Sequence, residues 1–341
     1  MASGSVDNVG MQLEEENPDN HNQPTTFLDL PLVYVMPIIA QYLRPKELFA
    51  LRCVSQYCKQ VVDDVGFAAL GIVDLTDSGC GWRNSRYNNM REEIVDARTA
   101  MKKRIMQKCR KAWKLKIDER WLTDYLIHDF LRNNPSLEAL HLVHCSPISN
   151  EALQPLLNCK NFSVLKVPDT QCGDDEFLRS LGQHNKQLLE LDLEDSNVRT
   201  FYSPTAIKNF VSKQPHLRYI CLPYIDDFDI NHKIIEIIVE ICKDLESIKL
   251  AGWRSGDDRP LLWLAESCKK LKEISLGDLN WRENREIVVY MTAKGINFHW
   301  GTGSNCYVDI EGYIFHDNSG DDDSGSEEDE VGILRVLNHL H

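Results

Sequence analysis

An apolar pattern of the form LxxLxL occurs six times between residues 137 and 276, and it constrains the fold more than any other feature. A unit of this kind has room for one strand and one helix, and such a unit cannot bury its apolar edge alone. We therefore expect the units to stack into an α/β solenoid. Neighbouring copies start 25 to 29 residues apart, and their first positions are Leu137, Phe162, Leu188, Leu217, Leu245 and Leu271.

Outside the expected strands, the units share a second pattern. Three of them end in a cysteine three residues before the next apolar position, namely Cys159, Cys242 and Cys268. Ser149 and Asn150 are suited to cap the helix that follows the first strand. The array resembles the cysteine-containing class of leucine-rich repeat. This resemblance implies parallel strands on a concave face and helices on a convex face.

Weaker copies of the pattern extend the array in both directions. We predict at least six strands, and seven or eight in all. The expected organisation is a linker helix with degenerate repeats over 65–136, a repeat array over 137–300 and a cap over 301–316. The upstream copies are Leu70, Val73 and Leu75, then Ala112, Leu115 and Ile117, and the downstream copy is Ile296, Phe298 and Trp300.

The formal net charge of −14 belongs to the two ends of the chain. Residues 1–26 hold five acids and no base, residues 295–341 hold ten acids and one base, and residues 27–294 hold 37 of each. We expect the acidic segments 1–26 and 317–341 to be disordered, because such compositions cannot form a core. The acidic C-terminal segment is either a solubilising tail or a regulated one, and its last residues favour a short terminal helix.

Cysteine usage and hydropathy indicate the compartment. The chain has 11 cysteines, no CxxC pair and no apolar run near 18 residues. It also lacks a basic-then-apolar N-terminal pattern. These features favour reduced, buried thiols in a cytoplasmic or nuclear protein, without a membrane span, a structural metal or a cofactor.

Residues 27–64, before the array, read as a compact group of short helices. Pro31 suits a first helical turn, and Arg44-Pro45 separates two apolar stripes. About 38 residues are too few for a comfortable independent core. We therefore expect this module to rest on a neighbour or to use its stripes for a partner. The stripes are Ile38, Ile39, Tyr42 and Leu43, then Leu48, Leu51 and Val54.

These positions carry a resemblance to the F-box, whose usual line begins Leu-Pro and ends in Val-Ser followed by a tryptophan. Leu30-Pro31 and Val54-Ser55 match its two ends. With the repeats, the chain resembles the F-box/leucine-rich-repeat family. The resemblance implies an F-box that binds a Skp-type adaptor of a cullin–RING ubiquitin ligase, and repeats that bind the substrate. The adaptor-binding residues it implies are Leu30, Pro31, Ile39, Leu43, Leu48, Leu51, Val54 and Cys58.

Two residues depart from the F-box pattern. Cys58 stands where the family usually has tryptophan, which removes a large apolar anchor. Pro37 interrupts the interior of the first predicted helix. They motivate an alternative function, a repeat-protein scaffold that binds other proteins without productive ligase docking.

The residues that alternate with the buried leucines are expected on the concave face. Carboxylates of one strand adjoin tyrosines of the next, which suits a basic or aromatic peptide. The alternative is that these are ordinary solvated strand residues. The predicted substrate-binding residues are Glu190, Asp192, Glu194, Tyr219, Tyr224, Lys249, Trp253 and Trp281.

Residues 97–120 contain ten bases and two acids. Ile105, Cys109 and Trp113 recur at spacing four, so we predict an amphipathic helix that covers the start of the solenoid. A phosphate-binding surface and pairing with the acidic tail are the alternatives. No catalytic motif is evident, and His141 and His144 are expected to be exposed polar residues rather than metal ligands. The function implied by the resemblance to the F-box/leucine-rich-repeat family is therefore that of a non-enzymatic substrate receptor of a ubiquitin ligase.

Overall fold

A computed structural model describes residues 31–76, 80, 92–194, 202–223, 228–250, 259–276, 285–300, 305–308 and 314–317. The predictions for residues 1–26 and for residues 318–341 lie outside the described residues. In the part of the chain that is described, no helix has both the length and the apolarity that a membrane crossing needs.

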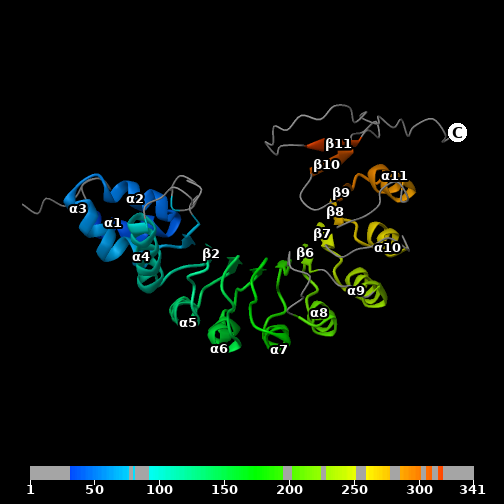
Figure 1. Cartoon of the computed structure of the whole chain (residues 1–341), viewed down its shortest axis with the longest axis horizontal. Helices are drawn as coiled ribbons and strands as arrows, with labels where there is room; N and C mark the ends of the chain where they lie inside the picture. Colours follow the sequence, from blue (N-terminus) through cyan, green and yellow to red (C-terminus); the bar gives the residue numbers. More distant parts are fainter. Residues whose placement is uncertain are drawn as a thin grey trace, which may run out of the picture.

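Nine parallel strands form one sheet in which each strand pairs with the next along the chain. The sheet is open rather than a barrel, and the strands line the inner side of an arc while the helices lie on its outer side (Figure 1). This architecture fits a repeat solenoid. The strands are β1 (Ile72–Asp74), β2 (Lys114–Asp118), β3 (Ala139–Val143), β4 (Val164–Lys166), β5 (Glu190–Asp192), β6 (Tyr219–Leu222), β7 (Ser247–Leu250), β8 (Glu273–Leu276) and β9 (Asn297–Trp300).

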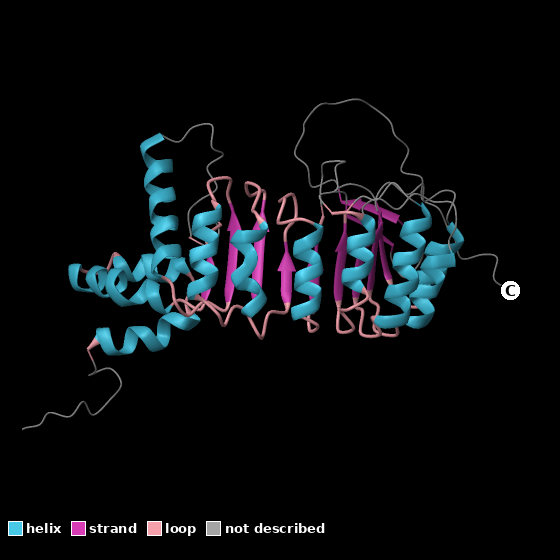
Figure 2. Cartoon of the chain, turned by 90° about the horizontal axis from the view of Figure 1, so that it is seen from below, coloured by secondary structure: helices cyan, strands magenta, loops and turns pink. Residues whose placement is uncertain are grey.

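Figure 2 shows the helices side by side across one face of the sheet. Ser149 caps the first helix of the array, because its Oγ accepts a hydrogen bond from the Ala152 backbone N–H at 3.3 Å. The helices between the strands are α4 (Glu92–Lys108), α5 (Asp124–Asn133), α6 (Asn150–Leu153) with the 3₁₀ turn η6 (Gln154–Asn158), α7 (Asp175–His184), α8 (Pro204–Val211), α9 (Phe228–Ile241), α10 (Arg259–Ser267) and α11 (Arg285–Ala293).

The apolar repeat positions form the core of the solenoid. The parallel register places equivalent residues next to each other in consecutive strands, as with Leu140, Leu165 and Leu191. All three are fully buried, and the residues between them and the next apolar position are half-buried on the other face. The weaker copies take part as well, since Val73, Leu115 and Phe298 lie in the same row. The described sheet therefore has nine strands, one more than the upper predicted number of eight, because both upstream copies and the downstream copy form strands.

A second buried row lies three residues before each first apolar position. Six of its seven side chains hydrogen-bond a backbone carbonyl about one unit earlier in the chain and so tie neighbouring units together, whereas the Cys159 thiol donates to the nearby Pro155 carbonyl. The Gln214 amide donates to the Asn185 carbonyl at 2.8 Å, and the Cys242 thiol donates to the Gln214 carbonyl at 3.5 Å. Burial raises the pKa of the Cys242 thiol to about 12, so the thiol stays protonated and able to donate. The row consists of Cys109, Asn134, Cys159, Asn185, Gln214, Cys242 and Cys268.

The N-terminal module is a cluster of short helices that leads directly into the sheet. β1 starts three residues after the module ends at Ala69, and Met36, Leu48 and Phe67 belong to the same core as the first strands. The module contains α1 (Leu32–Ile39), η2 (Ala40–Tyr42), α2 (Pro45–Arg52), α3 (Gln56–Val61), η3 (Val62–Gly66) and η4 (Phe67–Ala69).

The structure changes the prediction for the basic segment 97–120. The helix, α4, ends at Lys108, and β2 begins at Lys114. Ile105 and Cys109 are buried as expected, but Trp113 precedes the strand and is 38% exposed. The strand pattern of Leu115 and Ile117 overrides the helical spacing there, because both side chains are needed in the sheet core.

At the other end, β10 (Asn305–Val308) and β11 (Ile314–Asp317) form an antiparallel hairpin. β10 lies against β9, the last strand of the parallel sheet. The hairpin therefore lies over the C-terminal edge of the solenoid, within the segment expected to be its cap.

Candidate adaptor surface and concave face

The N-terminal module exposes a set of large apolar side chains, which we call the apolar patch. Tyr42 is 77% exposed and Val54 is 71% exposed. Of the large hydrophobic residues that are exposed in the described chain, two, Trp113 and Tyr125, lie outside this module. Large exposed apolar groups concentrated in one small module are a usual mark of a protein-binding surface. The apolar patch consists of Val33, Tyr34, Ile38, Tyr42, Val54 and Tyr57.

The helix α1 creates much of this patch because it is apolar on all sides. Val35 and Met36 face the core, and Tyr34 and Ile38, which are four residues apart, share the exposed face. Pro37 does not prevent the helix, which continues for two residues and then tightens into the 3₁₀ turn η2. The departure at Pro37 therefore leaves the exposed face of α1 in place.

The predicted adaptor-binding residues are distributed between core and surface. Leu48 is fully buried, so the prediction that it contacts an adaptor directly is wrong. Its side chain packs in the core instead. Among the others, Pro31 and Val54 are exposed, and Leu30 lies outside the described residues. The remaining four, all partly buried, are Ile39, Leu43, Leu51 and Cys58.

Sequence reasoning did not assign Val33, Tyr34 and Tyr57 to this surface. It placed Ile38 and Tyr42 in a stripe that could bind a partner, but not among the adaptor-binding residues. The 3.6-residue period carried part of the signal, since Ile38 and Tyr42 stand four residues apart in the first apolar stripe. The period alone does not say which apolar face of a helix is buried. That choice depends on the neighbouring helices α3 and η3, which cover the Met36 side.

Two contacts fix the module on the solenoid. At the first, Gly71 allows a close approach, because a Cβ there would lie 2.2 Å from the Gln41 carbonyl oxygen and 2.8 Å from the Trp113 indole nitrogen. The Gly71 carbonyl accepts hydrogen bonds from the backbone N–H groups of Trp113 and Lys114 at 2.9 and 3.1 Å. No side chain larger than hydrogen fits between the two parts.

The second contact is an ion-pair cluster on Asp63. Its carboxylate accepts two hydrogen bonds from the Arg52 guanidinium, at 2.8 and 3.2 Å, and Arg104 of α4 lies 3.9 Å away. Lys108 of α4 donates to the Asp63 carbonyl. Burial opposes ionisation of Asp63, but the Arg52 hydrogen bonds and the surrounding positive charges hold its pKa below the usual value.

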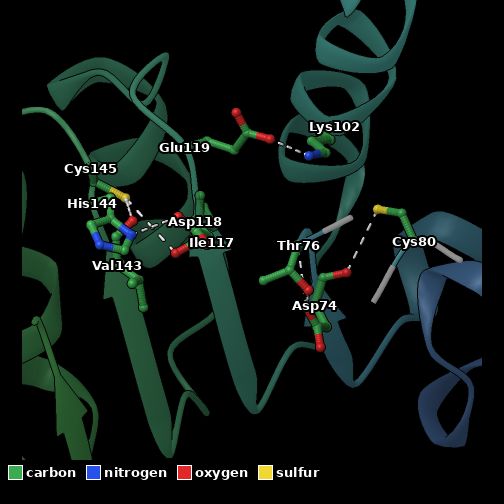
Figure 3. A network of polar contacts seen from close by, with 10 residues as sticks. All are labelled: Asp74, Thr76, Cys80, Lys102, Ile117, Asp118, Glu119, Val143, His144 and Cys145. Carbon is green, nitrogen blue, oxygen red and sulfur yellow. Dashed lines mark hydrogen bonds and ion pairs between the residues drawn. The ribbon is translucent and has the colours of Figure 1, made fainter. Parts of the chain in front are cut away.

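The helix α4 is also held by a buried ion pair at the strand ends. Lys102 is 2% exposed and its ammonium pairs with the Glu119 carboxylate (Figure 3). A buried charge requires such a partner. The basic side chains Lys102, Arg104 and Lys108 thus pair within the protein, which agrees with a helix that covers the start of the solenoid.

The concave face carries the predicted substrate-binding residues of β5 to β7. Glu190 and Tyr219 are neighbours in register, as are Asp192 and Cys221. Lys249 follows Cys221 in the same row on β7. Five of the eight predicted residues therefore come together, and Tyr224, Trp253 and Trp281 lie outside the described residues. The five are Glu190, Asp192, Glu194, Tyr219 and Lys249.

The carboxylates of this group are paired with lysines of the same face. Lys166 Nζ lies 2.6 Å from Glu190 Oε2 and 4.6 Å from the centre of the Tyr219 ring. Lys249 Nζ lies 2.6 Å from Glu194 Oε1. These pairs neutralise the acidic patch that the sequence suggested, so it offers little free charge to a basic peptide.

The same part of the concave face contains three side chains that could serve as ligands of a cation. Ligand atoms of Asp192, Glu194 and Cys221 lie within 4.8 Å of one another. However, the Lys249 ammonium already supplies the positive charge beside Glu194. Burial raises the pKa of both the Asp192 carboxyl and the Cys221 thiol, which disfavours the deprotonated forms that a metal requires. The cluster is an internal network rather than a metal site.

The two histidines of the first strong repeat lie in different surroundings. His141 is half-buried in the concave row between Lys116 and Lys166. His144 is exposed after β3, and its Nδ1 lies 3.1 Å from Asp118 Oδ1 (Figure 3). Its Nε2 lies 3.4 Å from Asp169 Oδ2. Both are polar surface residues as expected, although His141 is less exposed than predicted.

Comparison with protein families agrees with the geometry of the N-terminal module. The F-box domain matches residues 27–69, which includes every residue of the apolar patch. A comparison with curated proteins finds no match for the chain. F-box domains bind Skp-family adaptors within cullin–RING ligases. The chain thus contains an F-box domain, and this domain indicates in general the role of an adaptor subunit of Skp–cullin–F-box (SCF) ligases.

Proposed function

We propose that this protein is the substrate receptor of an SCF-type ubiquitin ligase. The apolar patch binds the Skp-family adaptor, the solenoid is a leucine-rich-repeat array, and its concave face binds the substrate. The protein performs no chemistry itself, as is typical of F-box proteins. It raises the local concentration of substrate lysines near the ubiquitin carrier.

The observation that carries this proposal is the exposure of six large apolar side chains within the matched F-box segment. Burying such a patch contributes roughly 25 cal/mol per Å² of apolar area. A free protein with this surface in water gains most from a partner that covers it. The tight junction at Gly71 and Asp63 then fixes the distance between adaptor and concave face.

The test is a double substitution, Ile38→Asp with Tyr42→Asp. Both side chains are exposed, so the fold remains and the adaptor meets two unpaired charges. We expect affinity for a purified Skp-family adaptor to fall at least about 100-fold in calorimetry. The matched control is Tyr125→Asp, a 75% exposed aromatic on the convex helix α5, which leaves adaptor binding unchanged.

Retained adaptor binding by the double variant would contradict the proposed surface. If the unmodified protein itself forms no complex with the adaptor at micromolar concentration, the second candidate is favoured, a binding scaffold without ligase docking. Its motivation is Cys58, a half-buried thiol where the F-box pattern has a tryptophan.

A further inference from the structure

Two lysines of β2 stand apart from the paired charges of the concave face. Lys114 and Lys116 are half-buried in their stems, and neither has a carboxylate within 4.0 Å in the part of the chain that the structure describes. The nearest carboxylate in register is Asp74, whose Oδ1 accepts hydrogen bonds from the Thr76 hydroxyl and backbone at 2.6 and 3.1 Å (Figure 3). Lys114 and Lys116 thus form no direct ion pair with a described carboxylate, and their ammonium groups can pair with carboxylates of a partner.

The neighbouring strand extends this positive region. His141 lies beside Lys116 in register, with Lys166 on its other side. Burial, and then the charges of Lys114, Lys166 and Lys116, lower the pKa of His141 to about 4. The imidazole is neutral at physiological pH and offers a hydrogen bond next to the two ammonium groups.

We propose that the concave surface of β2 and β3, formed by Lys114, Lys116 and His141, binds a carboxylate-rich segment of the substrate in extended conformation. The inference rests on the proposed role of the concave face as the substrate surface. It reverses the sign of the partner expected from the sequence, because Glu190 and Glu194 are paired with lysines whereas Lys114 and Lys116 form no ion pair with a described carboxylate.

The spacing of the lysines favours carboxylates over one phosphate group. Lys114 and Lys116 are two residues apart on one strand face, which corresponds to roughly 6.6 Å along the strand. An extended peptide repeats its side chains on one face at the same interval. A phosphate group is recognised best by the planar fork of arginine, whereas lysine acts as a point charge that pairs with separate carboxylates.

The experiment measures fluorescence anisotropy of labelled ten-residue peptides with the full-length protein. The probe alternates glutamate and serine, and its control alternates glutamine and serine. We expect the glutamate probe to bind at least about tenfold tighter in ~50 mM salt and to weaken as salt rises. A third probe carries one phosphoserine in the glutamine–serine background.

The variant Lys114→Gln/Lys116→Gln should lose about tenfold in affinity for the glutamate probe. The matched control, Lys160→Gln/Lys186→Gln, removes the same charge from exposed loop lysines before β4 and β5 and should change affinity less than twofold. Equal losses in the two variants would overturn the proposal, because net charge alone would then explain binding.

Two other outcomes also overturn it. Tighter binding of the phosphoserine probe would identify a phosphate site instead. Binding of the glutamate probe only after the seven acids of residues 321–330 are changed to amides would identify the chain's own acidic segment as the occupant. None of these measurements needs the adaptor, so their failure is distinguishable from failure of the Ile38→Asp/Tyr42→Asp test.

Discussion

The F-box domain and the concave face of the solenoid differ in the kind of side chain that they expose to solvent. The domain leaves apolar side chains such as Tyr34 and Tyr42 in water, and no part of the chain that the structure describes covers them. The concave face pairs most of its own charges, as in Lys166–Glu190 and Lys249–Glu194. The first surface gains free energy from almost any complementary partner. A partner that binds the concave face over β4 to β7 must instead replace existing ion pairs.

This difference suits a lasting partner at one surface and an exchangeable partner at the other. An apolar patch binds tightly because its burial involves no broken ion pairs. Partly exposed ion pairs contribute little affinity but reject partners of the wrong charge pattern. The junction that holds Gly71 against Gln41 joins the two surfaces into one rigid unit.

The largest effect on stability is expected from deletion of residues 31–69, which removes the F-box domain from the solenoid. The F-box domain shares its core with the solenoid, so its removal exposes Leu70, Val73 and Ile105, all fully buried in the intact chain. We expect loss of cooperative thermal unfolding, measured by circular dichroism, together with aggregation in size-exclusion chromatography. The Ile38→Asp/Tyr42→Asp chain is the control and should unfold like the parent. A deleted chain that melts cooperatively near the parent temperature would show that the two regions fold independently.

A smaller but specific effect is expected from Gly71→Ala. The added methyl group would lie 2.2 Å from a backbone oxygen, which cannot move without displacing η2. We expect a loss of about 3 kcal/mol in the free energy of unfolding, measured by urea titration. Gly66→Ala is the matched control, because its Cβ would meet Met36 at an ordinary 3.5 Å. Equal stability of the two variants would mean that the junction is not tight.

The sequence predicted the buried side of the repeats because one physical rule decides it. Leu115, Leu140 and Leu191 recur at strand spacing in every unit, and a parallel sheet aligns them without further information. Even the weak copy around Leu115 was placed correctly. A pattern that repeats along the chain specifies which residues align in neighbouring strands.

The exposed apolar face of the F-box domain and the charge pairing of the concave face depend on contacts that no local pattern encodes. Leu48 and Tyr42 are both apolar stripe residues, yet one is in the core and the other is largely in water. Glu194 and Lys249 pair across two strands, so their neutralisation depends on the curvature and register of the sheet. The sequence shows how many charged residues the concave face carries, but it does not show which of them form ion pairs.

A change of about 2 kcal/mol is expected from Asp63→Asn at neutral pH, since the carboxylate accepts two charge-assisted hydrogen bonds from Arg52. The folded-state pKa of Asp63 is depressed, so its contribution is fully present above the unfolded value near 3.8 and is lost as pH falls through the folded value. Urea titrations at several pH values should therefore show the parent and the variant converging below pH 3.8. Asp64→Asn, the exposed neighbour, should change stability by less than about 0.5 kcal/mol. Parallel pH curves for the parent and Asp63→Asn would contradict the role of the ionised carboxylate.

The smallest effect is expected from Lys249→Met in the concave face. The variant leaves Glu194 without its ammonium partner, but both side chains reach water in the parent, with 38% of Lys249 and 31% of Glu194 exposed. Solvent screens the pair, and we expect a loss of about 0.5 kcal/mol in urea titrations, falling further in high salt. The result is informative because the same lysine removal frees the Glu194 charge for a partner. A loss above about 2 kcal/mol would show that this ion pair stabilises the fold of the solenoid itself. A partner that displaced the pair would then destabilise the fold, so the concave face could not exchange partners.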